Sequence, residues 1–436
     1  MFAVVSVPFM TCGAMWFTRF RGWLVGLLIF ATALGDKANI NFMSYEWYRG
    51  TDRGFEVNLV DLIALSLVTA LLIRFPTRLK WWPFNSFWFF AYLGFGLIST
   101  YMAYDPLLAE FTLFKMAKLY MVYWCVVNVF QTGISPRNIW GGMCAVGILL
   151  TGLALYQKYI SHIYRIPGPF DHSNTIPLYV NLLMPMLLIW GLCDKRMNST
   201  WKAITVLSAL GMVFTIVATY SRAGIVLCGL CLFGVLVLIN FRLKSPRLSL
   251  ISILIIVATV AGGIKASDKI IERFKNAPES SGAARKEFNV SAKMMAKDHF
   301  FGVGMNNFSL AVTYFPKYRE HFVAMANEEE GGVAHHVYLL TAAEMGYAGL
   351  AVFGIFITRF FLMTGWYAWR SKSFAGLLLG GLFMGFGTLH LQGLLEWVLR
   401  QSPVSYLFVI TSGIAVAFME MIRKTNFAPL ELAGRY

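Results

Sequence analysis

Long apolar runs recur along the whole chain of 436 residues and restrict its fold more than any other feature. A helix needs roughly 17 to 25 residues to cross about 30 Å of hydrocarbon, and the runs reach or approach that length. Of the residues, 58% are hydrophobic and 14% are charged, and the mean hydropathy is +0.61. Most of the chain is therefore too apolar for soluble surface, which predicts an all-α polytopic membrane protein.

The order of apolar runs and basic connectors predicts the topology. Short connectors rich in Lys and Arg alternate with connectors poor in them, and basic connectors mark the cytoplasmic side. We expect thirteen spans, or twelve if the first run does not cross. The expected spans are 1–18, 22–35, 59–75, 84–103, 107–130, 139–160, 175–193, 203–219, 223–240, 248–264, 336–364, 374–399 and 403–422.

The remaining long segments fall on the outer side by the same alternation. They are residues 36–58, 161–174, 219–222 and 265–335. The chain shows no flexible linker and no internal repeat, so we expect one membrane domain over 1–436. The loop 265–335 is an outer subdomain within it, because a loop of this length is usually structured and functional.

This outer loop carries two stretches with apolar residues at helical spacing. They are "SDKIIERFKN" and "AARKEFNVSAKMMAKDHFFGVGMNNF", and both predict amphipathic helices over the membrane surface or over a cavity. The second stretch ends in "GVGMNNF", whose glycines and Asn pair predict a turn.

The net charge of +15 does not indicate nucleic-acid binding. The basic residues are scattered among the connectors rather than gathered on one face, so the charge is a topology signal. We therefore expect the chain to interact with the lipid bilayer and not with nucleic acid.

The outer segments collect five polar residues with possible chemical roles. They are Arg165, Arg222 in "TYSRAG", Arg285, His335 and His336. An arginine at the end of a span either snorkels to lipid headgroups or binds an anion, and its planar guanidinium suits a phosphate or diphosphate. Spacing alone does not single out Arg285 from the other basic residues of its helix.

Neighbouring His335 and His336 point about 100° apart on a helix, so they do not address one cavity together. Glu328 to Glu330 are expected to be solvated rather than metal ligands. We expect no metal and no other cofactor. One histidine would act as a base toward a sugar hydroxyl, or would be a structural residue at the membrane edge.

Ionisable residues also lie inside the expected spans. Lys115 and Lys118, at i and i+3, share one helix face and either line an anion cavity or meet Glu344. Glu396 and Arg400, at i and i+4, are expected to pair with each other.

Three motifs in order resemble those of the bacterial O-antigen ligase and polymerase superfamily of membrane glycosyltransferases. "TYSRAG" is similar to the Ser-Arg-Gly segment between two spans. The stretch beginning "ARKEF" is similar to an Arg-led helix followed by a glycine turn, with Phe288 where Trp or Tyr is usual. "AHHVYLL" resembles an Ala-His-Asn-x-Tyr-Leu motif, with His336 in place of Asn. The likeness covers about residues 165 to 365.

The resemblance implies a GT-C-like fold in the bacterial inner membrane and an active site facing the periplasm, so the outer loop would be periplasmic. It implies metal-independent, inverting transfer of a glycan from an undecaprenyl-diphosphate carrier. By position, His335, Arg222 and Arg285 match the family's catalytic residues. His336, Arg165, Lys115, Lys118 and Tyr338 are the expected substrate-binding residues.

The sequence is also compatible with other functions. An O-antigen ligase transfers the glycan to lipid A core or protein, whereas an O-antigen or exopolysaccharide polymerase joins lipid-linked repeats, and the motifs favour the ligase slightly. A transporter or flippase for a lipid-linked glycan would also place charges in the membrane, but the matching broken helices of two repeats are missing from the sequence.

Overall fold

The computed structural model describes residues 2–35, 39–265, 279–323 and 332–425. Within these ranges nearly all regular structure is helical, as predicted, and the two strands form one hairpin. The stretch "SDKIIERFKN" and Glu328 to Glu330 lie outside the described residues. The main elements are α1 (Phe2–Trp16), α2 (Thr18–Thr32), β1 (Asn39–Ser44), β2 (Gly54–Asn58), α3 (Leu59–Arg74), α4 (Ser86–Tyr101), α5 (Pro106–Val129), α6 (Arg137–Leu155), α7 (Thr175–Cys193), α8 (Ser199–Ala218), α9 (Arg222–Leu243), α10 (Pro246–Lys265), α12 (Glu279–Asp298), α13 (Phe308–Tyr314), α14 (Val337–Arg370), α15 (Phe374–Gln392) and α16 (Ser402–Lys424).

Eight described helices are long and apolar enough to cross a membrane, which makes the chain a multi-pass membrane protein. They are α5, α6, α7, α8, α9, α14, α15 and α16. The other expected spans coincide with α1 to α4 and α10. Because α1 to α4 have only 15 or 16 residues, the count of twelve to thirteen spans stays a prediction.

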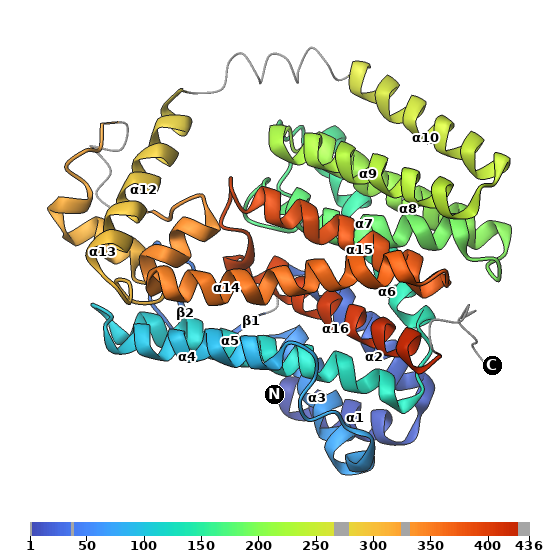
Figure 1. Ribbon diagram of the computed structural model, residues 1–436, viewed down its shortest axis with the longest axis horizontal. Helices are drawn as coiled ribbons and strands as arrows, with labels where there is room; N and C mark the ends of the chain where they lie inside the picture. The colour runs from blue at the N-terminus through green and yellow to red at the C-terminus, as the bar shows by residue number, and fades with distance from the viewer. Residues whose placement is uncertain (1, 36–38, 266–278, 324–331, 426–436) are drawn as a thin grey trace.

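The helices lie roughly side by side, and α14 runs along the length of the bundle (Figure 1). It lies between α4 and α5 on one side and α15 and α7 on the other. Helices α12 and α13 sit at the end where α14 begins, and the turn between α14 and α15 is at the opposite end. The two described α-helices of the segment between α10 and α14 therefore gather at one end of the bundle.

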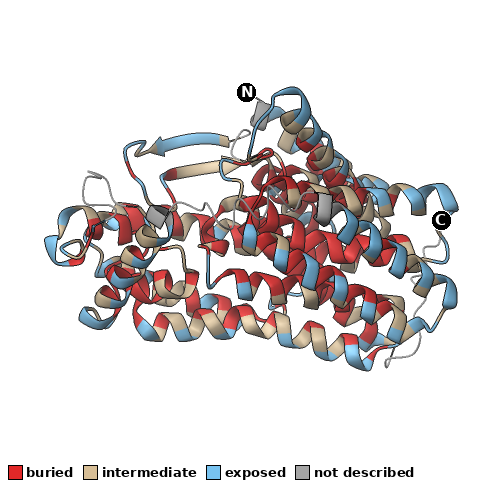
Figure 2. Cartoon of the chain, turned by 90° about the horizontal axis from the view of Figure 1, so that it is seen from above, coloured by how far each residue is buried: buried red, intermediate tan, exposed pale blue. Residues whose placement is uncertain are grey.

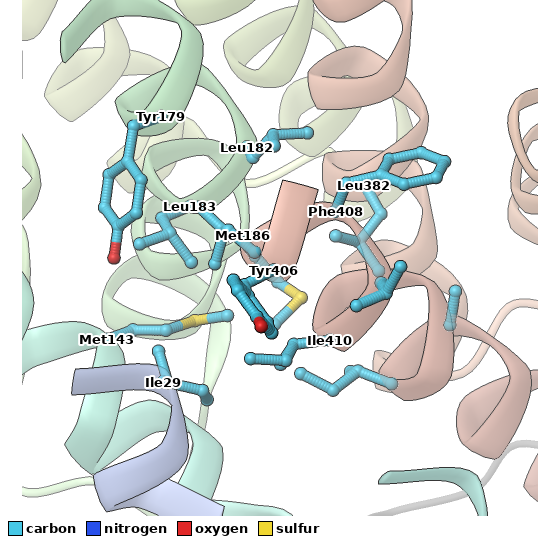
Figure 3. Close-up of a cluster of buried hydrophobic side chains, with 14 of the residues drawn as sticks. Ile29, Met143, Tyr179, Leu182, Leu183, Met186, Leu382, Tyr406, Phe408 and Ile410 are labelled. Atoms are coloured by element: carbon cyan, nitrogen blue, oxygen red, sulfur yellow. The ribbon is translucent and has the colours of Figure 1, made fainter. Parts of the chain in front are cut away.

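The apolar core runs through the middle of the bundle, where buried residues concentrate (Figure 2). Helices α7 and α16 are the most enclosed spans, with 89% of the apolar window of each buried. Leu183 and Met186 of α7 and Ile410 of α16 meet there beside Leu382 of α15 (Figure 3). Close packing of this kind holds the helices in fixed relative positions and so positions the segments at the end of the bundle that carries α12 and α13.

The segment 36–58, expected only as a connector, contains the antiparallel hairpin of β1 and β2. Its end is fixed because Asn58 caps α3 in a capping box with Asp61. Its loop is fixed by Asn306 of the "GVGMNNF" turn, whose Oδ1 accepts from Thr51 N at 3.0 Å and whose Nδ2 donates to Asp52 O at 2.7 Å. The predicted turn is confirmed, and it joins the outer loop to the hairpin.

Helix α14 is broken at Gly346, where the backbone adopts φ 71° and ψ 177°. A Cβ there would lie 1.8 Å from Phe300 O, so only glycine fits. The break frees carbonyl groups that a continuous helix would bond internally. Ala343 O accepts from Val303 N at 2.9 Å, and Glu344 O accepts from Gly304 N at 3.2 Å. The glycine turn is thus attached to a span through backbone hydrogen bonds.

Candidate active site

The connector 393–401 between α15 and α16 forms the centre of the site. Helix α15 ends at Gln392, so the expected span 374–399 was too long at its outer end. The sequence "GLLEW" is apolar enough to extend the predicted span, but Leu394 and Leu395 are about half exposed in the connector, at 48% and 46%. Glu396 therefore lies just beyond the helix and turns back into the protein.

Glu396 binds side chains from three other segments. Its Oε2 lies 3.0 Å from His335 Nδ1, and its Oε1 lies 2.9 Å from a terminal nitrogen of Arg285. The same Oε1 accepts a hydrogen bond from Asn174 Nδ2 at 2.8 Å. One carboxylate thus joins the loop before α7, helix α12 and the start of α14.

The surroundings of Glu396 favour its ionised form. The residue is only 5% exposed, and burial alone would raise the pKa of its carboxyl group. The hydrogen bond from His335 and the charges of His335 and Arg285 outweigh burial and hold the pKa of Glu396 below its usual range. An ionised carboxylate only accepts hydrogen bonds, so His335 Nδ1 carries the proton of this contact. In the neutral imidazole, Nε2 then holds a lone pair.

Arg165 extends this network to the "TYSRAG" turn. It donates to Asn174 Oδ1 at 3.1 Å and from Nε to the carbonyl of Thr219 at 3.1 Å. In that turn Tyr220 has φ 51°, and its ring stacks on Tyr164 with centroids 5.1 Å apart. The turn ends at Arg222, the exposed first residue of α9. Arg165 is therefore a link between the turn and Glu396.

His336 serves a different purpose from His335, because it is the N-cap of α14. Its Nδ1 accepts a hydrogen bond from Leu339 N at 3.3 Å, the role that an Asn side chain usually fills. Burial lowers the pKa of His336, which favours the neutral ring that this acceptor role requires. His336, which stands where the similar motif has Asn, thus caps the helix as an amide side chain would.

The expected pairing of Glu396 with Arg400 is wrong. It required one continuous helix over both residues, but the helix ends at Gln392 and Val398–Arg400 is a short 3-10 turn. Arg400 instead pairs with Glu344 at 2.8 Å, and both side chains are almost fully enclosed. This ion pair joins the connector to α14 near its break.

Lys115 and Lys118 share one face of α5, as predicted, but each binds a carboxylate other than Glu344. Lys115 lies 2.8 Å from Asp52 of the hairpin loop, and Lys118 lies 2.8 Å from Asp61 of α3. Both lysines line a cavity of about 470 Å³ beside the hairpin of β1 and β2. Tyr338 points elsewhere, with its hydroxyl group 3.0 Å from His390 Nδ1.

The structure thus gathers part of the predicted set. His335, Arg285 and, through Asn174, Arg165 meet at Glu396, whereas Lys115 and Lys118 line the neighbouring cavity. Glu396 itself was missed as a partner of His335. The sequence did contain a signal, an acidic residue at the outer end of a span, but the helical-spacing rule assigned it to Arg400.

Within the described ranges, no group of three or more His, Cys, Asp or Glu side chains has a metal-binding arrangement. The polar groups that converge on Glu396 are instead two cationic or potentially cationic side chains and one amide. This set is suited to holding an imidazole in one orientation beside an arginine.

Comparison with known families identifies the middle of the chain. Residues 207–354 match the family model described as O-antigen ligase. No curated protein matches the chain. The matched segment includes Arg222, Arg285 and His335, together with the glycine turn and the broken part of α14. The segment 207–354 is therefore similar to the O-antigen ligase family.

Proposed function

We propose that the protein is a glycosyltransferase of the O-antigen ligase type in a bacterial inner membrane. It would transfer a glycan from an undecaprenyl-diphosphate carrier to an acceptor hydroxyl group on the periplasmic side, without a metal. The observation that carries this proposal is the 3.0 Å contact between His335 Nδ1 and Glu396 Oε2, which directs Nδ1 at the carboxylate and leaves Nε2 to act as the base.

In this reaction His335 Nε2 takes the proton from the acceptor hydroxyl group. The acceptor oxygen attacks the anomeric carbon as the bond from that carbon to the diphosphate oxygen breaks. The diphosphate leaves with the electron pair, and attack from the opposite face inverts the anomeric centre. Glu396 acts as a positioning residue, because it orients the ring and stabilises the imidazolium that forms.

The arginines have the charge that the leaving group requires. Negative charge grows on the diphosphate as the glycosidic bond breaks, and a planar guanidinium donates two hydrogen bonds to phosphate oxygens. Arg285 approaches Glu396 through only one terminal nitrogen, and its side chain is 36% exposed. Arg222 begins α9 with an exposed side chain. We assign both to the diphosphate.

Deletion of the gene, followed by examination of the cell's glycans, tests the proposal. Long lipid-linked polymer that accumulates beside an unmodified acceptor would support a ligase. Accumulation of single lipid-linked repeats would identify a polymerase of the same superfamily instead. Unchanged glycans would contradict both activities.

A further inference from the structure

A cavity of about 470 Å³ lies next to the Glu396 network. Its walls are the hairpin of β1 and β2, the outer end of α5, the loop before α7 and the start of α16. This volume falls within the range of small-ligand sites, roughly 300 to 1,000 Å³.

Buried cations in the cavity wall are already neutralised by protein carboxylates. Lys115 pairs with Asp52, and the pKa of Asp52 is held below its usual range by Lys115 although burial alone would raise it. Lys118 pairs with Asp61, and Arg400 pairs with Glu344. Each of these three contacts measures 2.8 Å. A diphosphate would have to compete with these carboxylates. Arg53 also lines the cavity but is exposed to water, which screens its charge, so the buried part of the cavity favours an uncharged ligand.

The same wall combines aromatic rings with polar groups that lack partners. Phe114 and Trp397 are half-buried at the cavity and present apolar surface to it. Arg400 is 4% exposed and Gln401 is 7% exposed. Among the described residues, Arg400 Nε and Nη1 and Gln401 Oε1 have no hydrogen-bond partner. Aromatic rings beside polar lining residues such as His172, Gln401 and Ser402 match a sugar ring, which has apolar faces and hydroxyl groups at its edge.

The cavity and the Glu396 network share two segments of chain. Trp397 of the cavity directly follows Glu396, and Thr175 of the cavity directly follows Asn174, which binds Glu396. His172 and Trp397 bring these segments together, with ring centroids 6.4 Å apart. A ligand in the cavity therefore lies beside the residues that orient His335.

We propose that this cavity binds an uncharged saccharide unit of the acceptor glycan. The assignment to the acceptor rests on the proposed function, in which the acceptor hydroxyl group approaches His335 and the arginines take the donor diphosphate. The saccharide character of the ligand rests on the cavity alone. The site thus separates the neutral acceptor sugar from the charged end of the donor.

Saturation-transfer NMR on the full-length protein in detergent tests the saccharide assignment without any assay of activity. The probes are the methyl glycosides of glucose, galactose, mannose and rhamnose, with inorganic pyrophosphate as competitor. We expect signal transfer to at least one glycoside, unaffected by pyrophosphate. Trp397→Leu and Gln401→Leu should weaken this binding about tenfold each, whereas Trp369→Leu, at a 74% exposed tryptophan of α14, should leave it unchanged.

Two outcomes would overturn the saccharide assignment: no signal transfer to any glycoside, or displacement of the glycoside by pyrophosphate. The size-exclusion profile and thermal midpoint of each variant establish that it is folded. In a transfer assay Trp397→Leu should raise the acceptor KM about tenfold and leave the donor KM unchanged. A rise in donor KM instead would refute the acceptor assignment. Absence of any transfer by the wild type would contradict the proposed function, while the NMR result would still decide the ligand class.

Discussion

His335 and Glu396 are 61 residues apart in the chain, yet His335 Nδ1 and Glu396 Oε2 lie 3.0 Å apart. The contact brings the first residues before α14 against the connector that follows α15. It fixes which nitrogen of His335 carries the proton, and it gives the motif histidine a partner from outside the motif.

His335→Ala should abolish glycan transfer while the protein still inserts and expresses. Removal of a general base costs roughly 10²- to 10⁴-fold in rate. The measurement is transfer from the lipid-linked donor by membranes that contain matched amounts of protein. A variant with nearly normal transfer would remove His335 from the mechanism.

Glu396→Gln should lower kcat by roughly 10-fold or more and leave both KM values unchanged, because an uncharged amide stabilises the imidazolium less than a carboxylate does. For the same reason the acidic limb of the pH–rate profile should move to lower pH. A purely structural role predicts a lower thermal midpoint with no such movement, so the profile distinguishes the two roles.

Arg222→Lys and Arg285→Lys should each lose about 10²-fold in activity, since a point charge does not replace the planar guanidinium on a diphosphate. Lys286→Ala is the matched control, because Lys286 is an exposed neighbour on α12. The measurement is kcat/KM for the donor. Full activity of Arg222→Lys would show that this residue only snorkels to lipid headgroups.

Activity that survives EDTA is expected for all active variants, and rescue only by a divalent ion would contradict the metal-free reaction.

His336 should make stability pH-dependent in a defined direction. The pKa of His336 in the folded protein lies below the ordinary value of 6.5. At a pH between the folded-state pKa and 6.5, the unfolded chain therefore binds more protons than the folded protein does. Stability should therefore fall as the pH drops below about 6.5 and protonation of Nδ1 removes the cap. His336→Asn should retain the cap and remove the pH dependence that His336 gives to stability. His336→Ala should lower the free energy of unfolding by about 1 kcal/mol at neutral pH. Thermal midpoints at pH 5.5 and pH 7.5 measure both effects.

Gly346→Ala should destabilise the protein by about 3 kcal/mol or more, because a Cβ would collide with Phe300 O and the backbone has φ 71°. Gly354→Ala in the same helix is the matched control. A Cβ at Gly354 meets nothing within 4 Å, so this change should be neutral or stabilise by about 0.5 kcal/mol. Equal thermal midpoints for the two variants would contradict the structural account of the break.

The sequence predicted the positions of the helices far better than it predicted which side chains contact each other. Expected spans such as 175–193 and 403–422 agree closely with α7 and α16, because a run of apolar residues is bounded by polar ones. The outer end of α15 was misplaced because Leu394 and Leu395 continue the apolar run after the helix has ended. That error placed Glu396 in a helix and made Arg400 its apparent partner.

Long-range contacts explain the other differences. The motif pattern identified His335 and Arg285, but no local pattern relates them to Glu396 or Asn174, which lie on different segments. The hairpin was also missed, although "NINF" and "FEVN" alternate polar and apolar residues, because its strands have only six and five residues. Its loop is held by Asn306, more than 240 positions later. Such contacts depend on how the spans pack, and spacing along the chain does not encode that directly.

The position of Glu396 limits which segments of this chain can be exchanged with proteins of the O-antigen ligase family. The segment that matches the O-antigen ligase family ends at residue 354, whereas Glu396 and Asn174 lie on either side of it. A chimera that receives only residues 207–354 would acquire His335 and both arginines without the carboxylate that orients the histidine. We expect such a chimera to be inactive until the host supplies, or is given, an acidic residue at the equivalent of position 396.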